Sequence, residues 1–218
     1  MRKDKIGVFG GTFNPIHNGH IKAALQVQKT FLLDKVLVIP SYIPPHKGIP
    51  NVAPPKHRLQ MIKLAVASYP RFIPSSVEIE AKGKSYSILT LKKLRHQFPG
   101  TLMFFILGID AFLEIDTWRE YEKVLEQCHF IVISRPGYSL HDAKKLLGGK
   151  YKGRMIQVSG AAELSEMMGL PSKIYLMSID ALDIASKDIR RMVRKGESIT
   201  GLVAEDVKEY IHRHNLYQ

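Results

Sequence analysis

The feature that most constrains the fold is a strand-to-helix turn near the start of the chain. The apolar run 6–9 predicts a buried strand, and apolar residues at helical spacing begin at Ile21. Between them stands Gly10-Gly11-Thr12-Phe13-Asn14-Pro15-Ile16-His17-Asn18-Gly19-His20. In α/β proteins, a turn of this kind opens at the carboxyl end of the sheet, where ligands bind.

The residues of this turn predict an anion site. Gly10 and Gly11 lack a Cβ, so the main-chain N–H groups can approach a ligand closely. A helix that starts at 18 or 19 aims its unpaired donors and its positive dipole end into the turn. His17 and His20 are three residues apart and share a helix face. We therefore expect a phosphate here; the alternative is a glycine-rich turn whose histidines only cap or pack.

The later pattern predicts an α/β fold with a doubly wound, mainly parallel sheet of the Rossmann-like kind. Buried apolar runs at 35–40, 102–107, 129–134 and 173–177 read as strands, with helical patterns between them. A length of 218 residues fits one domain. We expect a single domain over 1–218, with 184–218 as a small helical C-terminal extension.

Several local expectations follow from the same periodicities. The run 72–79 predicts a strand, and Ser85-Tyr86-Ser87 predicts a helix cap. The helix that starts at Pro55 turns its apolar face inward through Leu59, Ile62, Ala65 and Val66, which leaves His57 and Arg58 as surface residues. A helix is expected at 140–147, and the rest of 139–172 carries little pattern.

Composition narrows the class of protein. Lys plus Arg number 32 against 20 Asp plus Glu, a formal charge of +12. Such a charge suits nucleic acid or polyphosphate substrates, and without an RNA-recognition, KH or zinc-finger pattern we expect no nucleic acid partner. No apolar run predicts a membrane span, and the first strand follows too soon for a signal peptide. The lone Cys128 reads as a buried apolar residue. We expect a cytoplasmic protein without a membrane partner.

Further polar residues follow predicted strands or open predicted helices. A loop stiffened by four prolines carries His46 and Lys47. Asp110 follows the strand 102–107, where a carboxylate can accept bonds from ribose hydroxyls or cap the next helix. Ser186, a candidate N-cap, and Arg190 open a late helix that either clamps a polyphosphate or is an ordinary amphipathic helix.

The segment 10–20 resembles the signature of the HxGH nucleotidyltransferases. Within that superfamily the chain is similar, along its whole length, to the bacterial nicotinate-nucleotide adenylyltransferases. The matching motifs are Pro44-Pro45-His46-Lys47, Gly108-Ile109-Asp110 with Trp118 eight residues later, Arg135-Pro136-Gly137-Tyr138, and 184–190. The resemblance implies transfer of the adenylyl group of ATP to nicotinate mononucleotide, which gives nicotinate adenine dinucleotide and pyrophosphate in NAD biosynthesis.

The resemblance also implies roles for single residues. His17, His20, Lys47 and Arg190 would be catalytic. Contacts to ATP would come from Gly10, Gly11, Thr12, Phe13, Gly19, Asp110, Arg135 and Ser186. The mononucleotide would be bound by His46, Ser87 and Trp118, with the indole stacked on the pyridine ring and the Ser87 region near the carboxylate.

One motif departs from the family pattern Ile-Ser-Ser-Thr-x-Ile-Arg. Ala185 and Lys187 replace the first Ser and the Thr, so one hydroxyl contact to the triphosphate is lost, and a lysine there could substitute as a point charge.

No nucleophile stands beside a base in the sequence, which favours direct transfer without a covalent enzyme intermediate. Mg²⁺ is expected with ATP, held by phosphate oxygens and water rather than by a carboxylate cluster. The expected partners are the small molecules ATP and nicotinate mononucleotide; the sequence leaves self-association as a homo-oligomer open.

Three other readings compete. A pantetheine-phosphate or glycerol-phosphate nucleotidyltransferase would share the first motif, but not the Pro-Pro-His-Lys run or the spacing of Asp110 and Trp118. An enzyme for nicotinamide mononucleotide is closer, and only Ser87 argues against it. A nucleotide-binding regulator without activity would keep Gly10 and Gly11 but would not need both histidines.

Overall fold

The chain folds into two compact units. The computed structural model describes residues 3–44, 52–146, 151, 153–158 and 172–218. Unit 1 contains Met1–Phe9, Ala23–Val36 and Tyr86–Ala181, and unit 2 contains Gly10–Lys22, Leu37–Ser85 and Leu182–Gln218. Strands β1 (Lys5–Gly11) and β2 (Lys35–Pro40) and helix α1 (Asn18–Phe31) pass from one unit into the other.

A seven-stranded sheet confirms the predicted α/β class. Its order is β3-β2-β1-β4-β5-β7-β6. The remaining strands are β3 (Phe72–Pro74), β4 (Leu102–Gly108), β5 (His129–Ile133), β6 (Met155–Val158) and β7 (Ile174–Met177). The pairs β1–β4, β4–β5, β5–β7 and β7–β6 are all parallel. Strand β6 was not predicted, because its four residues carry too short a pattern.

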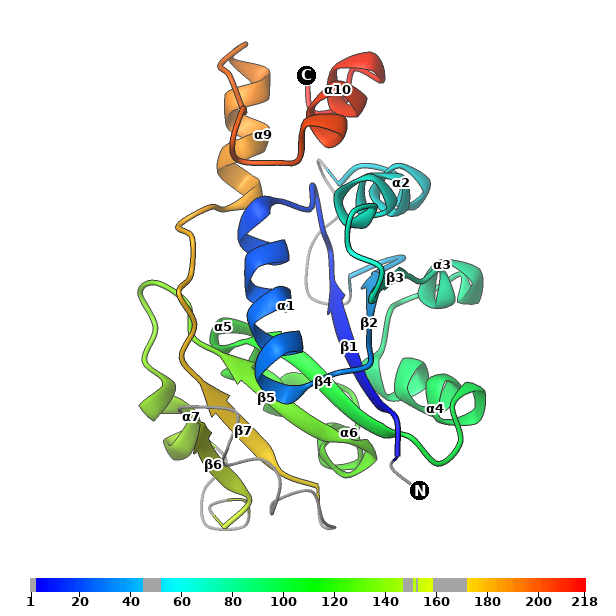
Figure 1. Cartoon of the computed structure of the whole chain (residues 1–218), viewed down its shortest axis with the longest axis vertical. Helices are drawn as coiled ribbons and strands as arrows, with labels where there is room; N and C mark the ends of the chain where they lie inside the picture. Colours follow the sequence, from blue (N-terminus) through cyan, green and yellow to red (C-terminus); the bar gives the residue numbers. More distant parts are fainter. Residues whose placement is uncertain (1–2, 45–51, 147–150, 152, 159–171) are drawn as a thin grey trace. The chain divides into compact units, whose positions relative to one another are not determined.

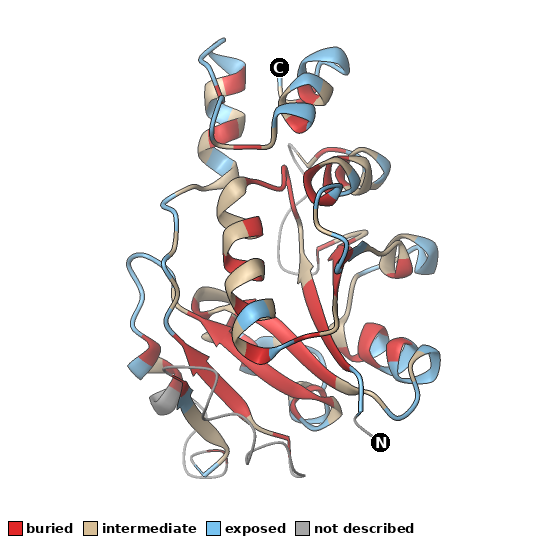
Figure 2. Ribbon diagram, in the orientation of Figure 1, coloured by how far each residue is buried: buried red, intermediate tan, exposed pale blue. Residues whose placement is uncertain are grey.

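Unit 1 is built on buried parallel strands. Figure 1 shows β4, β5 and β7 side by side, and Figure 2 shows them buried along their length. The helices of this unit are α4 (Ser87–Gln97), α5 (Ile109–Phe112), a 3₁₀ helix (Ile115–Thr117), α6 (Tyr121–Gln127) and α7 (Leu140–Leu146). The register pairs Gly108 with Ile133, so β4 and β5 end at the same edge of the sheet.

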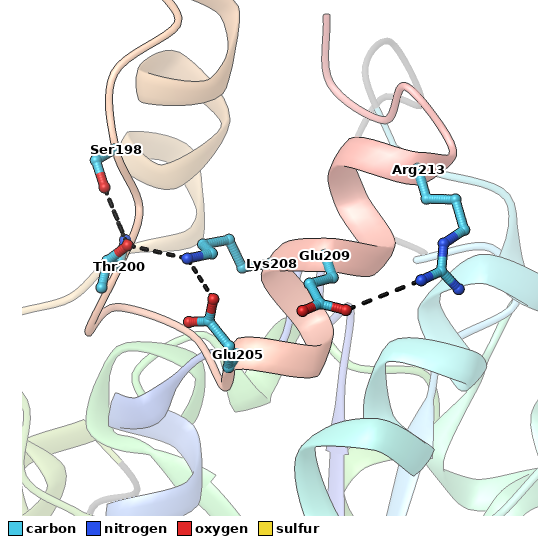
Figure 3. A network of polar contacts seen from close by, with 6 residues as sticks. All are labelled: Ser198, Thr200, Glu205, Lys208, Glu209 and Arg213. Carbon is cyan, nitrogen blue, oxygen red and sulfur yellow. Dashed lines mark hydrogen bonds and ion pairs between the residues drawn. The ribbon is translucent and has the colours of Figure 1, made fainter.

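Unit 2 holds the strand-to-helix turn, the start of α1 and, among its described residues, four further helices. These are α2 (Pro55–Val66), α3 (Val77–Ala81), α9 (Ser186–Arg194) and α10 (Glu205–Arg213). Polar contacts join the segment before α10 to the helix itself (Figure 3): Lys208 Nζ donates to Thr200 Oγ1 at 3.2 Å and pairs with Glu205. Both α9 and α10 fall within the predicted extension 184–218; that this stretch is an extension of one domain stays a prediction.

The predicted strand 72–79 is mostly wrong. Only Phe72–Pro74 is extended, and α3 begins at Val77. Pro74 has no N–H to donate to a sheet ladder, so the strand stops there. Glu78 and Glu80 then lie in the first turn of α3, where carboxylates interact favourably with the helix dipole.

The predicted cap at Ser85-Tyr86-Ser87 is confirmed in position, and the predicted N-cap at Ser186 is wrong by one residue. Tyr86 holds the N-cap position of α4, while the Ser85 hydroxyl accepts a hydrogen bond from the Tyr42 N–H at 2.8 Å. Ala185 holds the N-cap position of α9, and Ser186 is its first helical residue. In both places the serine hydroxyl binds a distant segment of the chain rather than an N–H group of the nearby helix.

Cys128 is buried as predicted, although it lies directly before β5 rather than inside the strand. Burial raises the pKa of its thiol to about 12, so the thiol stays protonated and unreactive. Among the helices that the structure describes, none is both long enough and apolar enough to cross a bilayer.

Candidate active site

The glycine-rich turn has the backbone that its sequence predicts. Strand β1 ends at Gly11 and α1 begins at Asn18. A Cβ on Gly11 would lie 3.0 Å from the ring of Phe13, so a side chain there would press on that ring. Phe13 is buried and has a φ of 47°, a left-handed conformation that costs free energy in a residue other than glycine. Contacts around the turn must therefore hold it in place.

The two histidines lie face to face, as their spacing predicts. Their rings are stacked with centroids 3.6 Å apart. The main-chain N–H of His17 donates to His20 Nδ1 at 3.2 Å, and the N–H of His20 donates to His17 Nδ1 at 3.3 Å. Since each Nδ1 accepts a hydrogen bond, each neutral ring carries its proton on Nε2. The arrangement fixes two N–H donors of the same kind next to each other.

Gly19 packs closely against this stack. A Cβ at position 19 would lie 3.1 Å from His17 Nδ1 and 3.5 Å from the carbonyl oxygen of Leu182. Any side chain would therefore press on the ring of His17, which is buried at 7% exposure, while His20 is half-buried.

The late helix α9 contacts the turn directly. Ser186 Oγ donates to the carbonyl oxygen of Pro15 at 2.9 Å, and Arg190 Nη1 donates to that of Asn14 at 2.7 Å. Burial lowers the pKa of the Arg190 guanidinium. Its Nε is buried and makes no hydrogen bond within the described part of the chain. The turn and α9, about 170 positions apart in the sequence, are thus in contact. The Nε–H of Arg190 remains available to a ligand.

The prediction that Arg58 lies at the surface is wrong. Its side chain is fully buried and donates to three main-chain oxygens: Nε to Ala53 at 2.8 Å, Nη1 to Thr12 at 2.8 Å and Nη2 to Tyr42 at 3.2 Å. A signal for this was present, because positions 61, 62 and 65 of the buried face of α2 follow Arg58 at helical spacing. The charge of Arg58 favoured the surface, but its position on the helix favoured the interior, and the position was decisive.

His57, also expected at the surface, is half-buried beside the C-terminal helix. Its Nδ1 lies 2.9 Å from the hydroxyl of Tyr210, and burial lowers the pKa of its imidazole.

Asn14 is a second residue that sequence reasoning passed over. Its Oδ1 accepts hydrogen bonds from the Ala53 N–H at 2.9 Å and from the Tyr217 hydroxyl at 2.8 Å. Burial raises the pKa of the Tyr217 hydroxyl, which stays a neutral donor. The side chain of Asn14 thereby joins the turn to the entrance of α2 and to the end of the chain.

In unit 1, two predicted ATP contacts lie together. Asp110 and Arg135 form an ion pair at the edge where β4 and β5 end. Gly108, not Asp110, holds the N-cap position of α5, so the alternative role of Asp110 as a cap is wrong. Both side chains are partly exposed, so this pair contributes little to stability.

The predicted mononucleotide contacts Trp118 and Ser87 also lie in unit 1. Trp118 is half-buried, and its indole meets the ring of Phe105 edge-on, with centroids 6.0 Å apart. Ser87 is the first residue of α4, and the preceding Tyr86 lies under the guanidinium of Arg119 at 5.0 Å. The predicted His46 and Lys47 lie outside the described residues.

These features, a parallel α/β sheet and a glycine-rich turn with paired histidines at the start of α1, define a class of nucleotidyltransferases. The family model for cytidylyltransferase-like proteins matches residues 8–192. A curated relative from Geobacter metallireducens, "Probable nicotinate-nucleotide adenylyltransferase", is 38% identical over 98% of both chains. A relative of the same name from Desulfatibacillum aliphaticivorans is 39% identical over 98% of this chain and 99% of its own. The chain belongs to the nicotinate-nucleotide adenylyltransferase family.

A solved structure confirms the predicted fold. The structure of "Plasmodium falciparum nicotinic acid mononucleotide adenylyltransferase complexed with NaAD" superposes with a TM-score of 0.76. The match covers 98% of this chain and 97% of that chain at 20% identity. The Rossmann-like nucleotidyltransferase fold is therefore shared between proteins whose sequences have diverged widely.

Proposed function

We propose that this protein transfers the adenylyl group of ATP to nicotinate mononucleotide, in the synthesis of NAD. The observation that carries the proposal is the stacked pair His17 and His20, whose Nδ1 atoms are both occupied by main-chain donors. Family membership supports the same reaction. The products are nicotinate adenine dinucleotide and pyrophosphate.

The chemistry is a direct in-line transfer. An oxygen of the 5′-phosphate of nicotinate mononucleotide attacks the α-phosphorus of ATP, and the bond to the oxygen that bridges the α and β phosphates breaks. Negative charge grows on the α-phosphate and on the leaving pyrophosphate. The Nε2–H groups of His17 and His20 donate to these oxygens, so that fixed dipoles stabilise the transition state without reorganising. No covalent intermediate with the protein is formed.

Two further cations would supply the other phosphate contacts. Arg190, whose buried Nε lacks a partner among the described residues, donates to the β and γ phosphates together with Lys47. An anion would satisfy that orphan donor, which is otherwise costly to bury. The remaining ATP contacts come from the neighbourhood of Ser186 and from main-chain donors of the glycine-rich turn. Those main-chain donors belong to Gly10, Gly11, Thr12, Phe13 and Gly19.

Further residues are assigned to recognition of the rest of the two substrates. Asp110 accepts bonds from the adenosine ribose and Arg135 contacts ATP, and the two side chains lie together where β4 and β5 end. Trp118 stacks on the pyridine ring, and the N-terminus of α4 at Ser87 binds the nicotinate carboxylate, because a helix N-terminus attracts anions. His46 is assigned to the mononucleotide by the family motif alone.

In this proposal Mg²⁺ would be bound by ATP rather than by a site in the protein. Across the described ranges, no three His, Cys, Asp or Glu side chains group as a metal site. Oxygens of the triphosphate and water would be its ligands, and its charge would offset that of the phosphates. We further propose a cytoplasmic enzyme whose partners are small molecules rather than nucleic acid or membrane.

Pyrophosphate release tests the function. ATP would be supplied with nicotinate mononucleotide, nicotinamide mononucleotide, phosphopantetheine or glycerol phosphate in parallel reactions. We expect release with nicotinate mononucleotide at a rate well above the other three, and loss of that release when Mg²⁺ is chelated. Faster release with phosphopantetheine or glycerol phosphate would overturn the assignment, and faster release with nicotinamide mononucleotide would change the acceptor.

A further inference from the structure

Arg58 is a charged residue whose burial needs an explanation. Its side chain is fully buried, and its three hydrogen bonds all go to neutral main-chain oxygens. Burying a guanidinium costs free energy, which its hydrogen bonds to these three oxygens must offset. We therefore ask what the three oxygens bound by Arg58 hold in place.

The donors of Arg58 close a ring of hydrogen bonds around Phe13. Nη1 binds the carbonyl oxygen of Thr12, and Nε binds that of Ala53. The N–H of Ala53 in turn binds Oδ1 of Asn14. The residues on either side of Phe13 are thus fixed to one guanidinium, directly at Thr12 and through Ala53 at Asn14.

Phe13 is the residue that this ring constrains. Its φ of 47° is unfavourable in isolation and persists only where the surroundings determine it. Its ring meets the imidazole of His20 edge-on, with centroids 5.1 Å apart and planes at 77°. A change in the Phe13 backbone would therefore move the surface against which His20 rests.

We infer that Arg58 is a positioning residue for the transfer reaction: through Thr12, Ala53 and Asn14 it holds Phe13 in its left-handed conformation, and thereby holds the imidazole of His20. This inference rests on the proposed function for its kinetic effect, but the placement of His20 can be measured without turnover. Arg58 touches no substrate in this scheme.

The first test compares Arg58→Lys with Met61→Ala. Lysine keeps the charge, but one ammonium cannot reach three oxygens in the fork geometry of a guanidinium. Met61 is also fully buried on α2 and serves as a control for lost stability alone. We expect Arg58→Lys to lower kcat roughly ten- to hundredfold, with KM for ATP changed much less, because small displacements of a reacting group carry such costs. Equal kcat values in the folded fractions of the two variants would overturn the inference.

The second test asks whether the effect passes through Phe13. In Phe13→Leu, the ring that rests on His20 is gone, so adding Arg58→Lys should cost less than about threefold in kcat. An undiminished loss in that background would contradict the inference. If Arg58→Lys does not fold, Arg58→Gln replaces it in the same cycle, since it removes the charge but keeps an amide donor.

The third readout is independent of activity. The ¹⁵N shifts of the His20 ring report which nitrogen carries the proton. We expect Arg58→Lys to shift them and Met61→Ala to leave them unchanged. If the wild-type protein releases no pyrophosphate but the ring signals respond as expected, the proposed function fails and the positioning role stands. Unchanged His20 signals in folded Arg58→Lys would refute that role whatever the activity.

Discussion

Arg190 and Asn14, 176 positions apart in the sequence, are joined by a hydrogen bond of 2.7 Å from the guanidinium Nη1 to the main-chain oxygen. The same asparagine accepts bonds through its side chain from Ala53 and Tyr217. The turn that bears the histidines is therefore held by the middle and by the end of the chain. Its geometry is a property of unit 2 and not of the local segment alone.

Loss of one imidazole should abolish most of the turnover. We expect His20→Ala to lower kcat roughly a hundredfold or more, as for the loss of a preorganised donor to a developing charge. Thermal unfolding should show that the fold is kept. His96→Ala, a change at an exposed histidine of α4, is the matched control. Turnover near the wild-type value in His20→Ala would rule out the proposed role.

Arg190 should matter for ATP far more than its neighbour does. We expect Arg190→Ala to raise KM for ATP about tenfold or more, since charge-assisted bonds to phosphate are strong. Arg191→Ala offers the comparison, because Arg191 is exposed and pairs with Asp188 at 3.0 Å. Initial rates over a range of ATP concentrations would separate the two variants. Similar KM values would show that Arg190 only supports the turn.

Trp118 should discriminate between the two substrates. Because the indole is proposed to stack on the pyridine ring, Trp118→Ala should weaken binding of nicotinate mononucleotide more than binding of ATP. Calorimetric titration with each ligand alone would measure both. The indole also packs edge-on against Phe105, so equal losses for the two ligands would point to a structural tryptophan.

Stability should decline in mild acid because of His129. Burial lowers the pKa of this imidazole from 6.5 to about 4, and its Nδ1 accepts the N–H of Lys173 at 3.0 Å. In the unfolded chain the His129 imidazole binds a proton at a higher pH than in the folded chain. The contribution of the neutral imidazole to the unfolding free energy is therefore complete above pH 6.5, and it is lost as the pH falls toward 4. The total is about 3 kcal/mol.

Urea unfolding between pH 5 and pH 8 would measure this contribution. His129→Gln should flatten the pH dependence of the unfolding free energy, and His96→Gln, a change at an exposed histidine of α4, is the control. An unchanged slope in His129→Gln would mean that other groups cause the acid sensitivity.

The strand-to-helix turn, the main parallel strands and the face shared by His17 and His20 could be predicted because they depend on neighbours in sequence. Periodicity places apolar residues on strands and helices, and glycine spacing marks where the backbone must turn. The prediction of a capping side chain failed where a serine hydroxyl can bind either its own helix or a distant segment. Ser85 and Ser186 could cap their own helices, yet their hydroxyls bind Tyr42 and Pro15 instead.

By itself, then, the sequence determined the α/β class, the position of the glycine-rich turn and the pairing of its histidines, since all of these follow from short-range pattern. Only the tertiary structure decided that Arg58 is buried, that Asn14 links three segments, and that Asp110 pairs with Arg135. The physical reason is that a buried polar group must find its hydrogen-bond partner in space, and that partner can stand anywhere in the chain.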